Sequence, residues 1–378
     1  MRIAFLCKRR YMGKDVILDR YARLYEIPRQ LARLGHEVRG YCLDYGRGAP
    51  GEWIHDGSPG TLHWESRPLG RLGLPGLLRY PASLLRRLRA FRPDMLVAAS
   101  DIPHVALGRL LSDRLEVPYV VDLYDNFEGF GQARIPCFVP MLRWGTRGAA
   151  LVTTTSEPLR QLVVNGYGLP GECVVTMPSS VDKAVFHRQD AIGARRKLGL
   201  PLDMPLIGTA GGLYRDKGIA ALYAAWERIR SGRPDVHLVL AGPYRGELPP
   251  PRDERVHYLG EMAHNDVATL FSALDVGVIS VLDTAFGRYC FPQKAYEMLA
   301  CGLPVAAADV GAMSDLFRDC PTALFTADDP SGLADAVLRQ LARPTTADIA
   351  VPDWAALVGS IEPSLRRLAA QRHLAVAT

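Results

Sequence analysis

The chain has 378 residues, of which 48% are hydrophobic and 22% are charged, and its formal net charge is +5. This composition is typical of a globular chain long enough for two packed cores, and it excludes disordered, collagen-like and coiled-coil proteins. Arg, Asp, Pro or Gly interrupts every apolar run well before the ~18 residues that a membrane-spanning helix needs. The first apolar run, residues 2–7, enters Lys8-Arg9-Arg10 without a small-residue cleavage site, so no signal peptide is predicted.

The cysteines and the charge distribution limit the compartment and the partners. The seven cysteines are scattered, and none is paired at metal-ligand or redox spacing, so free thiols in a reducing, cytoplasmic compartment are expected. Residues 1–178 carry a net charge of +7 and the remainder −2. This asymmetry indicates an anionic partner for the first half, either a membrane surface or a phosphorylated substrate. Nucleic acid is not expected, because no helix-turn-helix, zinc-finger or aromatic-plus-basic strand signature is present.

The first half alternates short β-branched runs with amphipathic stretches, which predicts a doubly wound parallel sheet. The predicted strands are Arg2–Cys7, Val38–Tyr41, Thr61–Glu65, Met95–Ala98, Tyr119–Leu123, Leu151–Thr155 and Cys173–Met177. The clearest helix is 19–34, where Asp19 is expected to cap the start and Gly35 to end the helix.

A second α/β series follows a connection at residues 178–205. Its predicted strands are Leu206–Ala210, His237–Ala241, Val256–Leu259, Val276–Ile279, Val305–Ala308 and Ala323–Phe325. We expect two Rossmann-like domains, 1–180 and 190–350, with the C-terminal helix 354–378 joined to the first. In such a pair the carboxyl ends of both sets of strands face a cleft, where ligands are expected.

The most informative segment runs from Phe286 to Val305. Pro292 suits the first turn of a helix and Gly302 its end, which leaves the amides of residues 291–294 facing an anion. Glu297, one turn further on, is placed to accept two hydroxyls of a sugar whose phosphates lie at that helix start. The alternative is that Glu297 only offsets the helix dipole and that Lys294 pairs with a carboxylate at the surface.

A second candidate phosphate loop is Gly208 to Gly218, in which a strand enters the pair Gly211-Gly212 and then a helix from Ile219. The glycines allow the backbone to approach a ligand closely, and Lys217 supplies a point charge. A plain connection between strand and helix has the same appearance. The loop is not a Walker loop, because the lysine has the wrong spacing and no Ser or Thr follows it.

Together these segments resemble the donor half of the retaining glycosyltransferases of family 4, which have the GT-B fold. The resemblance covers nearly the whole chain. The matching positions are Leu34 to Val38, Pro178 to Asp182 with Phe186, Gly211 to Gly218, and Pro292, Lys294, Glu297, Gly302, Pro304 and Val305.

The resemblance implies that Lys217 binds the donor diphosphate, that Glu297 binds the ribose hydroxyls, and that the backbone of residues 291–293 binds the distal phosphate or sugar. The full implied donor set is Gly211, Gly212, Arg215, Lys217, Arg288, Tyr289, Phe291, Pro292, Gln293, Lys294 and Glu297. Gly212 stands where many relatives have an arginine, and Tyr289 where they often have a glutamate. No cofactor is implied, and without an Asp-x-Asp motif no metal is implied either.

Candidate catalytic residues follow the strand Tyr119–Leu123. Asp122 and Asp125 can accept hydrogen bonds from sugar hydroxyls or take a proton, and Tyr124 stands where many relatives have a histidine facing the transferred sugar. The alternative is that these carboxylates cap the next turn. Asp125 is expected to matter more, because it lies beyond the strand end.

Two basic segments of the first half are further candidates. Lys8, Arg9, Arg10, Gly13 and Lys14 follow the first strand and either bind a phosphate of donor or acceptor or form a solvated loop. The stretch 77–91 alternates leucines with arginines, as in a basic helix that lies on anionic lipid, although an ordinary helix docked on its own sheet is the favoured interpretation.

The expected function is transfer of a hexose or related sugar from a UDP- or GDP-sugar to a hydroxyl of a sugar, lipid-linked or small-molecule acceptor, with retention. Assembly of cell-surface polysaccharide or glycolipid at the inner face of the membrane fits this activity. Two alternatives stay open: a nucleotide-sugar epimerase of the same architecture, and a nucleotide-binding module that needs a partner.

Overall fold

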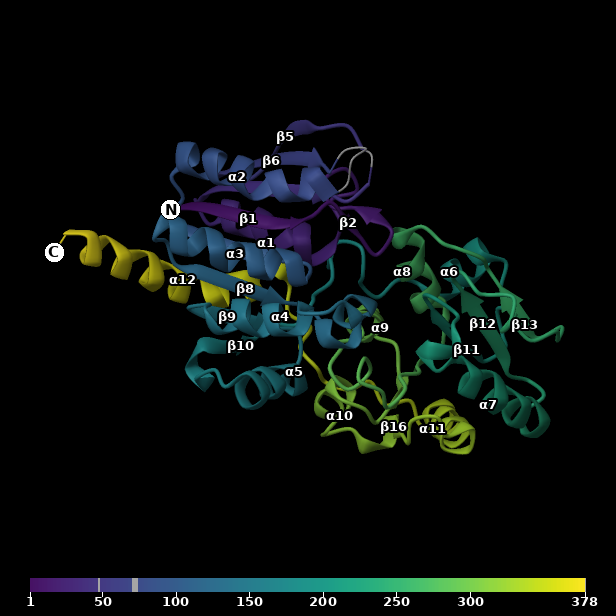
Figure 1. The fold of residues 1–378 in the computed structure, drawn as a ribbon. Helices are drawn as coiled ribbons and strands as arrows, with labels where there is room; N and C mark the ends of the chain where they lie inside the picture. The colour runs from purple at the N-terminus through teal and green to yellow at the C-terminus, as the bar shows by residue number, and fades with distance from the viewer. Residues whose placement is uncertain (47, 70–73, 378) are drawn as a thin grey trace. The chain divides into compact units, whose positions relative to one another are not determined.

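The computed structural model describes residues 1–46, 48–69 and 74–377 (Figure 1). The chain divides into two compact units. Unit 1 contains Met1–Ser179 and Trp354–Thr378, and unit 2 contains Ser180–Asp353. Within the described ranges, no helix has both the length and the apolar character needed to cross a membrane.

Unit 1 is built on an eight-stranded sheet with the order β10-β9-β8-β7-β1-β4-β6-β5. Its strands are β1 (Arg2–Lys8), β4 (Glu37–Asp44), β5 (Gly51–His55), β6 (Thr61–Pro68), β7 (Met95–Ala99), β8 (Tyr119–Leu123), β9 (Leu151–Thr154) and β10 (Val174–Thr176), with a small hairpin of β2 (Arg10–Tyr11) and β3 (Lys14–Asp15). The predicted strands are confirmed, with shifted ends. The sheet is not wholly parallel as predicted, because β5 pairs antiparallel with β6 at the edge.

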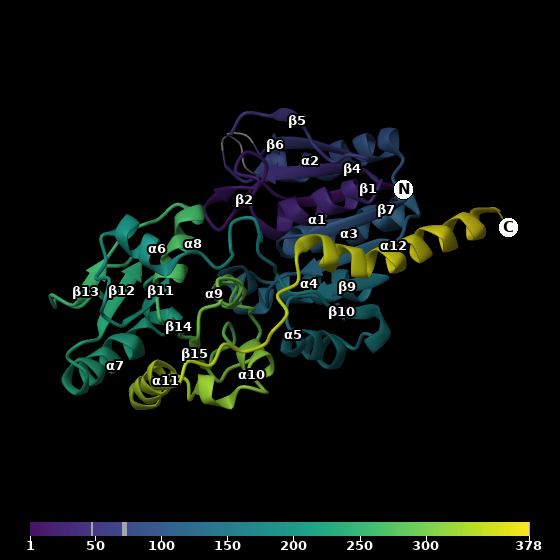
Figure 2. The same ribbon diagram turned by 180° about the vertical axis from the view of Figure 1, so that it is seen from behind.

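Helices cover both faces of this sheet. They are α1 (Ala22–Arg33), α2 (Leu74–Phe91), α3 (Ile102–Leu115), α4 (Phe138–Arg147), α5 (Glu157–Gln161) and α12 (Trp354–Ala377). Figure 1 shows α2, α3 and α4 on the face toward the viewer, and Figure 2 shows α1 and α12 on the other. Leu24 and Leu31 of α1 and Ile361 of α12 share one buried cluster with Phe5 of β1. The C-terminal helix therefore completes the core of unit 1.

Two expectations about helices in unit 1 need comment. The first helix begins at Ala22 rather than at residue 19, because the Asp19 carboxylate accepts the Asp15 amide at 2.7 Å and does not cap the helix. In α2, Leu84, Leu88 and Phe91 are buried, whereas Leu77 and Leu78 at its start are 39% and 73% exposed. The helix thus docks on its own sheet, and its exposed face carries Arg79, Arg86 and Arg89.

Unit 2 has a six-stranded parallel sheet with the order β13-β12-β11-β14-β15-β16. The strands are β11 (Leu206–Ala210), β12 (His237–Ala241), β13 (Val256–Tyr258), β14 (Val276–Ile279), β15 (Val305–Ala308) and β16 (Leu324–Phe325). The helices are α6 (Ala191–Leu198), α7 (Ile219–Gly232), α8 (His264–Ala273), α9 (Lys294–Ala300), α10 (Ala312–Leu316) and α11 (Pro330–Ala342). The predicted connection 178–205 therefore contains a helix, α6, whose first turn is capped by Asp190 and which ends at Gly199.

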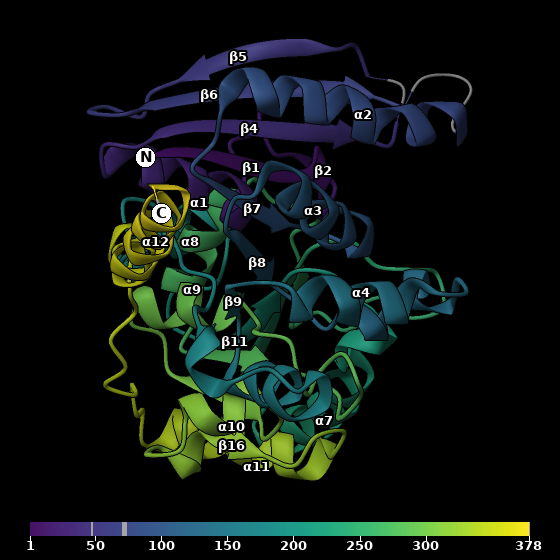
Figure 3. The same cartoon turned by 60° about the vertical axis from the view of Figure 1, so that its left-hand side comes forward.

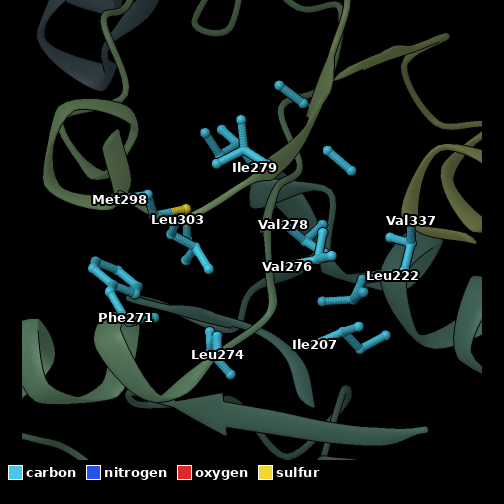
Figure 4. Packing of buried hydrophobic residues seen from close by; sticks show 14 of the residues in the cluster. Ile207, Leu222, Phe271, Leu274, Val276, Val278, Ile279, Met298, Leu303 and Val337 are labelled. Atoms are coloured by element: carbon cyan, nitrogen blue, oxygen red, sulfur yellow. The ribbon is translucent and has the colours of Figure 1, made fainter. Parts of the chain in front are cut away.

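The core of unit 2 seats α9 against the sheet. Met298 of α9 and Leu303, just after it, lie side by side in this cluster (Figure 4). A side chain at Gly277 of β14 would meet the Met298 sulfur at 2.6 Å and Leu303 at 2.8 Å. Because Gly277 has no side chain, α9 packs close over β14, and this contact sets the position of the residues on its first turn.

A buried ion pair ties together distant parts of unit 1. The Arg23 guanidinium of α1 donates to both Asp122 oxygens of β8, at 2.8 and 2.9 Å from Nε, and Arg23 is fully buried. It also donates to the Met177 carbonyl at 2.7 Å. Thr153 of β9 donates to Asp122 at 2.6 Å. One carboxylate therefore joins α1, β8 and β9, and its guanidinium partner reaches the end of β10.

Replacing Asp122 by Asn should lower the free energy of unfolding by ~3–5 kcal/mol, because Arg23 would stay buried without its counter-charge. Urea unfolding followed by circular dichroism measures this. Asp125→Asn is the matched control and should cost less than about 1 kcal/mol, since its side chain is partly exposed. Equal losses in the two variants would contradict the assignment of Asp122 as a structural brace.

Candidate functional site

The carboxyl edge of the unit 2 sheet carries the glycine loop that the sequence singled out. Gly211 follows β11 with φ +112°, and the loop then passes through the short 3-10 turn Arg215–Lys217 into α7. A side chain at Gly242, which follows β12, would meet the Gly211 carbonyl oxygen at 2.0 Å. The loops after two neighbouring strands are thus packed backbone to backbone, which holds Gly211 in place.

Helix α9 enters the same edge from another loop. Gln293 is its N-cap residue and Lys294 its first helical residue, so Pro292 lies ahead of the helix and not in its first turn as predicted. The first hydrogen bonds of the turn run from Ala295 N to Pro292 O and from Glu297 N to Gln293 O. Gly302 follows the helix with φ +71°, which confirms its predicted place at the end.

Three charged side chains converge where these loops meet. Lys294 Nζ lies 3.3 Å from Thr209 Oγ1 of β11, and it is the group nearest to the open side of Gly211. Lys217 Nζ lies 3.8 Å from the centre of the Phe286 ring, and the Lys217 carbonyl accepts from Ser280 after β14. Glu297 lies one turn after Lys294 on α9. The loop before α7 and the start of α9 thus contribute one cluster with two cations and one carboxylate.

The protonation of this cluster reflects burial and the neighbouring charges. Burial lowers the pKa of Lys294 to about 8; Glu297 opposes this shift and Lys217 adds to it. Burial raises the pKa of Glu297 to about 7, against the opposing effects of Lys294 and of a hydrogen bond from Gln293. Burial disfavours the charged form of both groups, and Lys217 further disfavours the charged form of Lys294, whereas Lys294 favours an ionised Glu297. An anion bound beside both lysines would relieve their repulsion.

The other predicted donor residues surround the cluster in different ways. Arg288 is exposed and paired with Asp283, so its guanidinium is already engaged. The Phe291 ring packs on Tyr296 of α9 with centroids 4.6 Å apart. Arg215 is exposed on the loop, while Gly212 and Tyr289 are partly buried. The structure therefore brings Gly211, Lys217, Lys294 and Glu297 together, with Arg215 and Arg288 at the surface.

In unit 1 the three predicted catalytic residues have different surroundings. Asp122 is the buried partner of Arg23 described above and has almost no surface. The Tyr124 hydroxyl donates to the Ser100 carbonyl at 2.5 Å, and burial raises its pKa well above the usual value, so it stays protonated. Asp125 is partly exposed and accepts from the Asn126 amide at 2.9 Å. Of the three, Asp125 has a carboxylate that reaches the surface.

The residues of the predicted phosphate loop after β1 also differ in burial. Arg9 is buried, pairs with Asp15 at 2.9 Å and lies over the Trp53 ring. Arg10 and Lys14 are exposed on the β2–β3 hairpin, and Gly13 supplies its turn with φ +80°. The hairpin thus presents two cations, while Arg9 holds it to the body of unit 1.

Sequence reasoning missed a buried polar group at the carboxyl edge of unit 1. Asp101 caps α3 and lies 2.6 Å from His104 Nδ1, and the Tyr45 hydroxyl donates to Asp101 at 2.9 Å. Asp101 also acts electrostatically on Lys8 at the end of β1. The available signal was an aspartate three residues before a histidine, a spacing at which an N-cap and a first-turn residue meet.

The described residues contain no group of three or more His, Cys, Asp or Glu side chains arranged to hold a metal ion.

Comparison with family models matches both units. The model described as "Glycosyl transferase 4-like domain" matches residues 22–179, and "Glycosyl transferases group 1" matches residues 204–343. The chain belongs to these glycosyl transferase families. The second match spans Gly211, Lys217, Lys294 and Glu297, so the charged cluster lies within the family's own domain.

Individual relatives cover different shares of the chain. It is 32% identical over 186 residues to a D-inositol 3-phosphate glycosyltransferase of Stackebrandtia nassauensis, covering 45% of this chain and 41% of that protein. It is 25% identical over 303 residues to TuaC of Bacillus subtilis, named as a teichuronic acid biosynthesis glycosyltransferase, covering 77% and 71%. The match thus spans less than half the length of the first relative and about seven tenths of the second.

The solved structures agree on the fold. A crystal structure of Anabaena HepE in complex with UDP matches over 100% of both chains with a TM-score of 0.66 and 18% identity. This likeness, together with the two parallel-sheet units, shows the GT-B fold that the sequence predicted.

The charged cluster makes a direct prediction about Lys294. In reductively ¹³C-methylated protein, the Lys294 resonance should titrate near pH 8, well below ordinary lysines. Lys217→Ala should raise this pKa, because a neighbouring cation is removed, and Glu297→Gln should lower it, because the opposing charge is lost. NMR titration measures all three values, and Lys294→Arg identifies the resonance. If the pKa of Lys294 is the same in both variants as in the native protein, the three side chains do not interact.

Proposed function

We propose that this protein is a glycosyltransferase that moves a sugar from a nucleoside diphosphate sugar to an acceptor hydroxyl. The observation that carries the proposal is the cluster of Lys217, Lys294 and Glu297 beside Gly211, at the carboxyl edge of β11 and β14. In open α/β sheets, ligands bind at this edge where the strand order reverses, and β11 and β14 are the strands on either side of that reversal.

The cluster suits the two parts of a nucleotide. Lys217 and Lys294 supply the positive charge that a diphosphate needs, and Gly211 lets the backbone approach it without a side chain in the way. Glu297, ionised, accepts hydrogen bonds from two ribose hydroxyls. UDP in the HepE structure is consistent with a uridine donor, and a guanosine donor is the alternative that a nucleotide screen separates.

The same groups would promote departure of the donor diphosphate. Negative charge grows on the leaving phosphate as the bond to the sugar breaks, and the two ammonium groups are already positioned to stabilise it. Retention of configuration follows from the family resemblance. The acceptor proton then goes either to the departing phosphate or to Asp125, the surface carboxylate of unit 1.

We place the acceptor on the carboxyl edge of the unit 1 sheet. Asp125 there would receive a hydroxyl, and Arg10 and Lys14 on the β2–β3 hairpin would attract a negatively charged acceptor or donor group. Assembly of a cell-surface polysaccharide or glycolipid fits such an acceptor. The exposed arginines of α2 (Arg79, Arg86 and Arg89) would favour contact with an anionic membrane surface, without insertion of the buried leucines.

Glu297→Gln should weaken nucleotide binding by ~1–3 kcal/mol per lost ribose hydrogen bond and remove most turnover, because the amide cannot accept two hydroxyls equally well. Calorimetry with UDP and GDP measures binding, and release of nucleotide from UDP- and GDP-sugars in the presence of an acceptor mixture measures turnover. Glu254→Gln, an exposed site in the same unit, is the control. Unchanged affinity in Glu297→Gln would remove this residue from the donor site.

Lys217→Ala should lower the affinity for UDP at least tenfold and leave the affinity for uridine nearly unchanged, because only the diphosphate carries the charge that Lys217 binds. Lys197→Ala, whose ammonium pairs with Asp266 at 2.9 Å on the surface of unit 2, is the matched control and should change neither. Equal losses for UDP and uridine would argue against a phosphate role.

Two outcomes of the turnover assay would favour the alternative functions. Consumption of the nucleotide sugar without any acceptor would favour an epimerase. Nucleotide binding without turnover would favour a partner-dependent module.

A further inference from the structure

An apolar groove opens in unit 1 between α2, α3 and α4, which follow one another across the sheet in Figure 3. Its volume is about 370 Å³, within the range of small-molecule sites. Twelve residues line it: Leu43, Leu77, Tyr80, Pro81, Pro103, His104, Ala106, Leu107, Leu110, Phe138, Met141 and Trp144. The walls are aliphatic, aromatic or proline side chains apart from the Tyr80 hydroxyl and the imidazole, so the chemistry of the groove suits a hydrocarbon.

The rim of this groove exposes large apolar side chains. Leu77 is 39% exposed, Met141 37% and Trp144 47%. The Arg109 guanidinium lies 5.8 Å from the centre of the Trp144 ring, but it pairs with Asp113 at 3.0 Å, so its charge is already balanced. Apolar surface gathered around a concave site is the mark of a binding surface. Arg79, Arg86 and Arg89 are exposed on α2, the helix that forms one wall of the groove, and they favour a ligand with an anionic end.

One polar atom in the wall lacks a partner. His104 is buried, and its Nδ1 is held 2.6 Å from Asp101 Oδ1. Its Nε2 has no hydrogen-bond partner among the described residues. A buried polar atom left unpaired is costly to the folded state, and this one belongs to a residue that lines the groove.

The groove begins at the carboxyl edge of the sheet. Leu43 is the second-last residue of β4, and His104 lies in the first turn of α3, which follows β7. Asp101, the partner of His104, also accepts from Tyr45 at this edge and acts electrostatically on Lys8. A ligand with its chain in the groove would therefore present its polar end beside Lys8 and Tyr45, at the edge where the acceptor is proposed to bind.

We propose that this groove holds the hydrocarbon chain of an amphiphilic acceptor whose anionic head lies at the carboxyl edge of unit 1. The occupant is a single-chain lipid phosphate, attracted by the apolar walls, by the exposed arginines of α2 and by Lys8 at the edge. The proposal rests on the proposed function only in naming this ligand an acceptor. Binding of the chain itself is independent of donor binding in unit 2.

The probe is dodecyl phosphate carrying a terminal bromine, used below its micelle concentration. Bromine quenches tryptophan fluorescence on contact, and Trp144 lines the groove. The native protein should show saturable quenching that unbrominated dodecyl phosphate reverses and inorganic phosphate does not. Trp144→Phe should lose this signal. Quenching that persists in Trp144→Phe would place the chain elsewhere and overturn the proposal.

Ala106→Phe fills the groove from α3 and should lower the affinity for dodecyl phosphate at least tenfold. Ala82→Phe, on the exposed side of α2, is the matched control and should bind as the native protein does. Met141→Asp at the rim gives a second test that leaves the core intact, with exposed Leu18→Asp as its control. Native affinity in both groove variants would overturn the proposal.

Two further measurements separate this proposal from its rivals. UDP affinity should be the same in all these variants, so a failure of the donor site would appear there and not in dodecyl phosphate binding. Light scattering of the native protein tests whether a second copy covers the groove. A dimer that Ala106→Phe dissociates, together with no binding of dodecyl phosphate, would assign the groove to self-association and overturn the proposal.

Discussion

The close packing of α9 over β14 is the contact on which the candidate donor site depends. Gly277 leaves room for Met298 and Leu303 to reach the strand, and the core of unit 2 closes around them. With the helix seated in this way, Lys294 reaches Thr209 of the neighbouring strand, and Glu297 shares its surroundings. The electrostatics of the site are thus a consequence of apolar packing on the other side of the same helix.

Packing also explains why the cluster is strained electrostatically. Lys294 and Glu297 lie on the packed first turn of α9, and burial moves the pKa of each toward the neutral form. Such shifts are common where a protein holds charged groups ready for a charged ligand. Repulsion between Lys217 and Lys294 lowers the stability of the folded protein, and a bound diphosphate would offset this repulsion.

Unit 1 uses its charges differently. Arg23 with Asp122 and Arg9 with Asp15 are buried pairs that hold elements together. In contrast, Arg10, Lys14 and three arginines of α2 (Arg79, Arg86 and Arg89) are exposed. Because the buried pairs are neutral, the net positive charge of this unit comes from cations at its surface. The groove between α2, α3 and α4 adds an apolar surface to the same unit. An anionic amphiphile matches both properties.

The sequence by itself determined the two parallel-sheet domains, because buried β-branched runs and helical periodicity are local patterns. It also singled out Lys217, Lys294 and Glu297, since these residues stand in motifs that can be read along the chain. Only the tertiary structure decided which charges are buried in ion pairs. Asp122 and Asp125 are alike in sequence, yet Asp122 meets Arg23, 99 residues away, and Asp125 reaches the surface. The antiparallel edge strand β5, the pairing of His104 with Asp101 and the groove beside it likewise depend on residues that the fold brings together. Local patterns report burial and periodicity, but the partner of a charged side chain is chosen by contacts between distant segments.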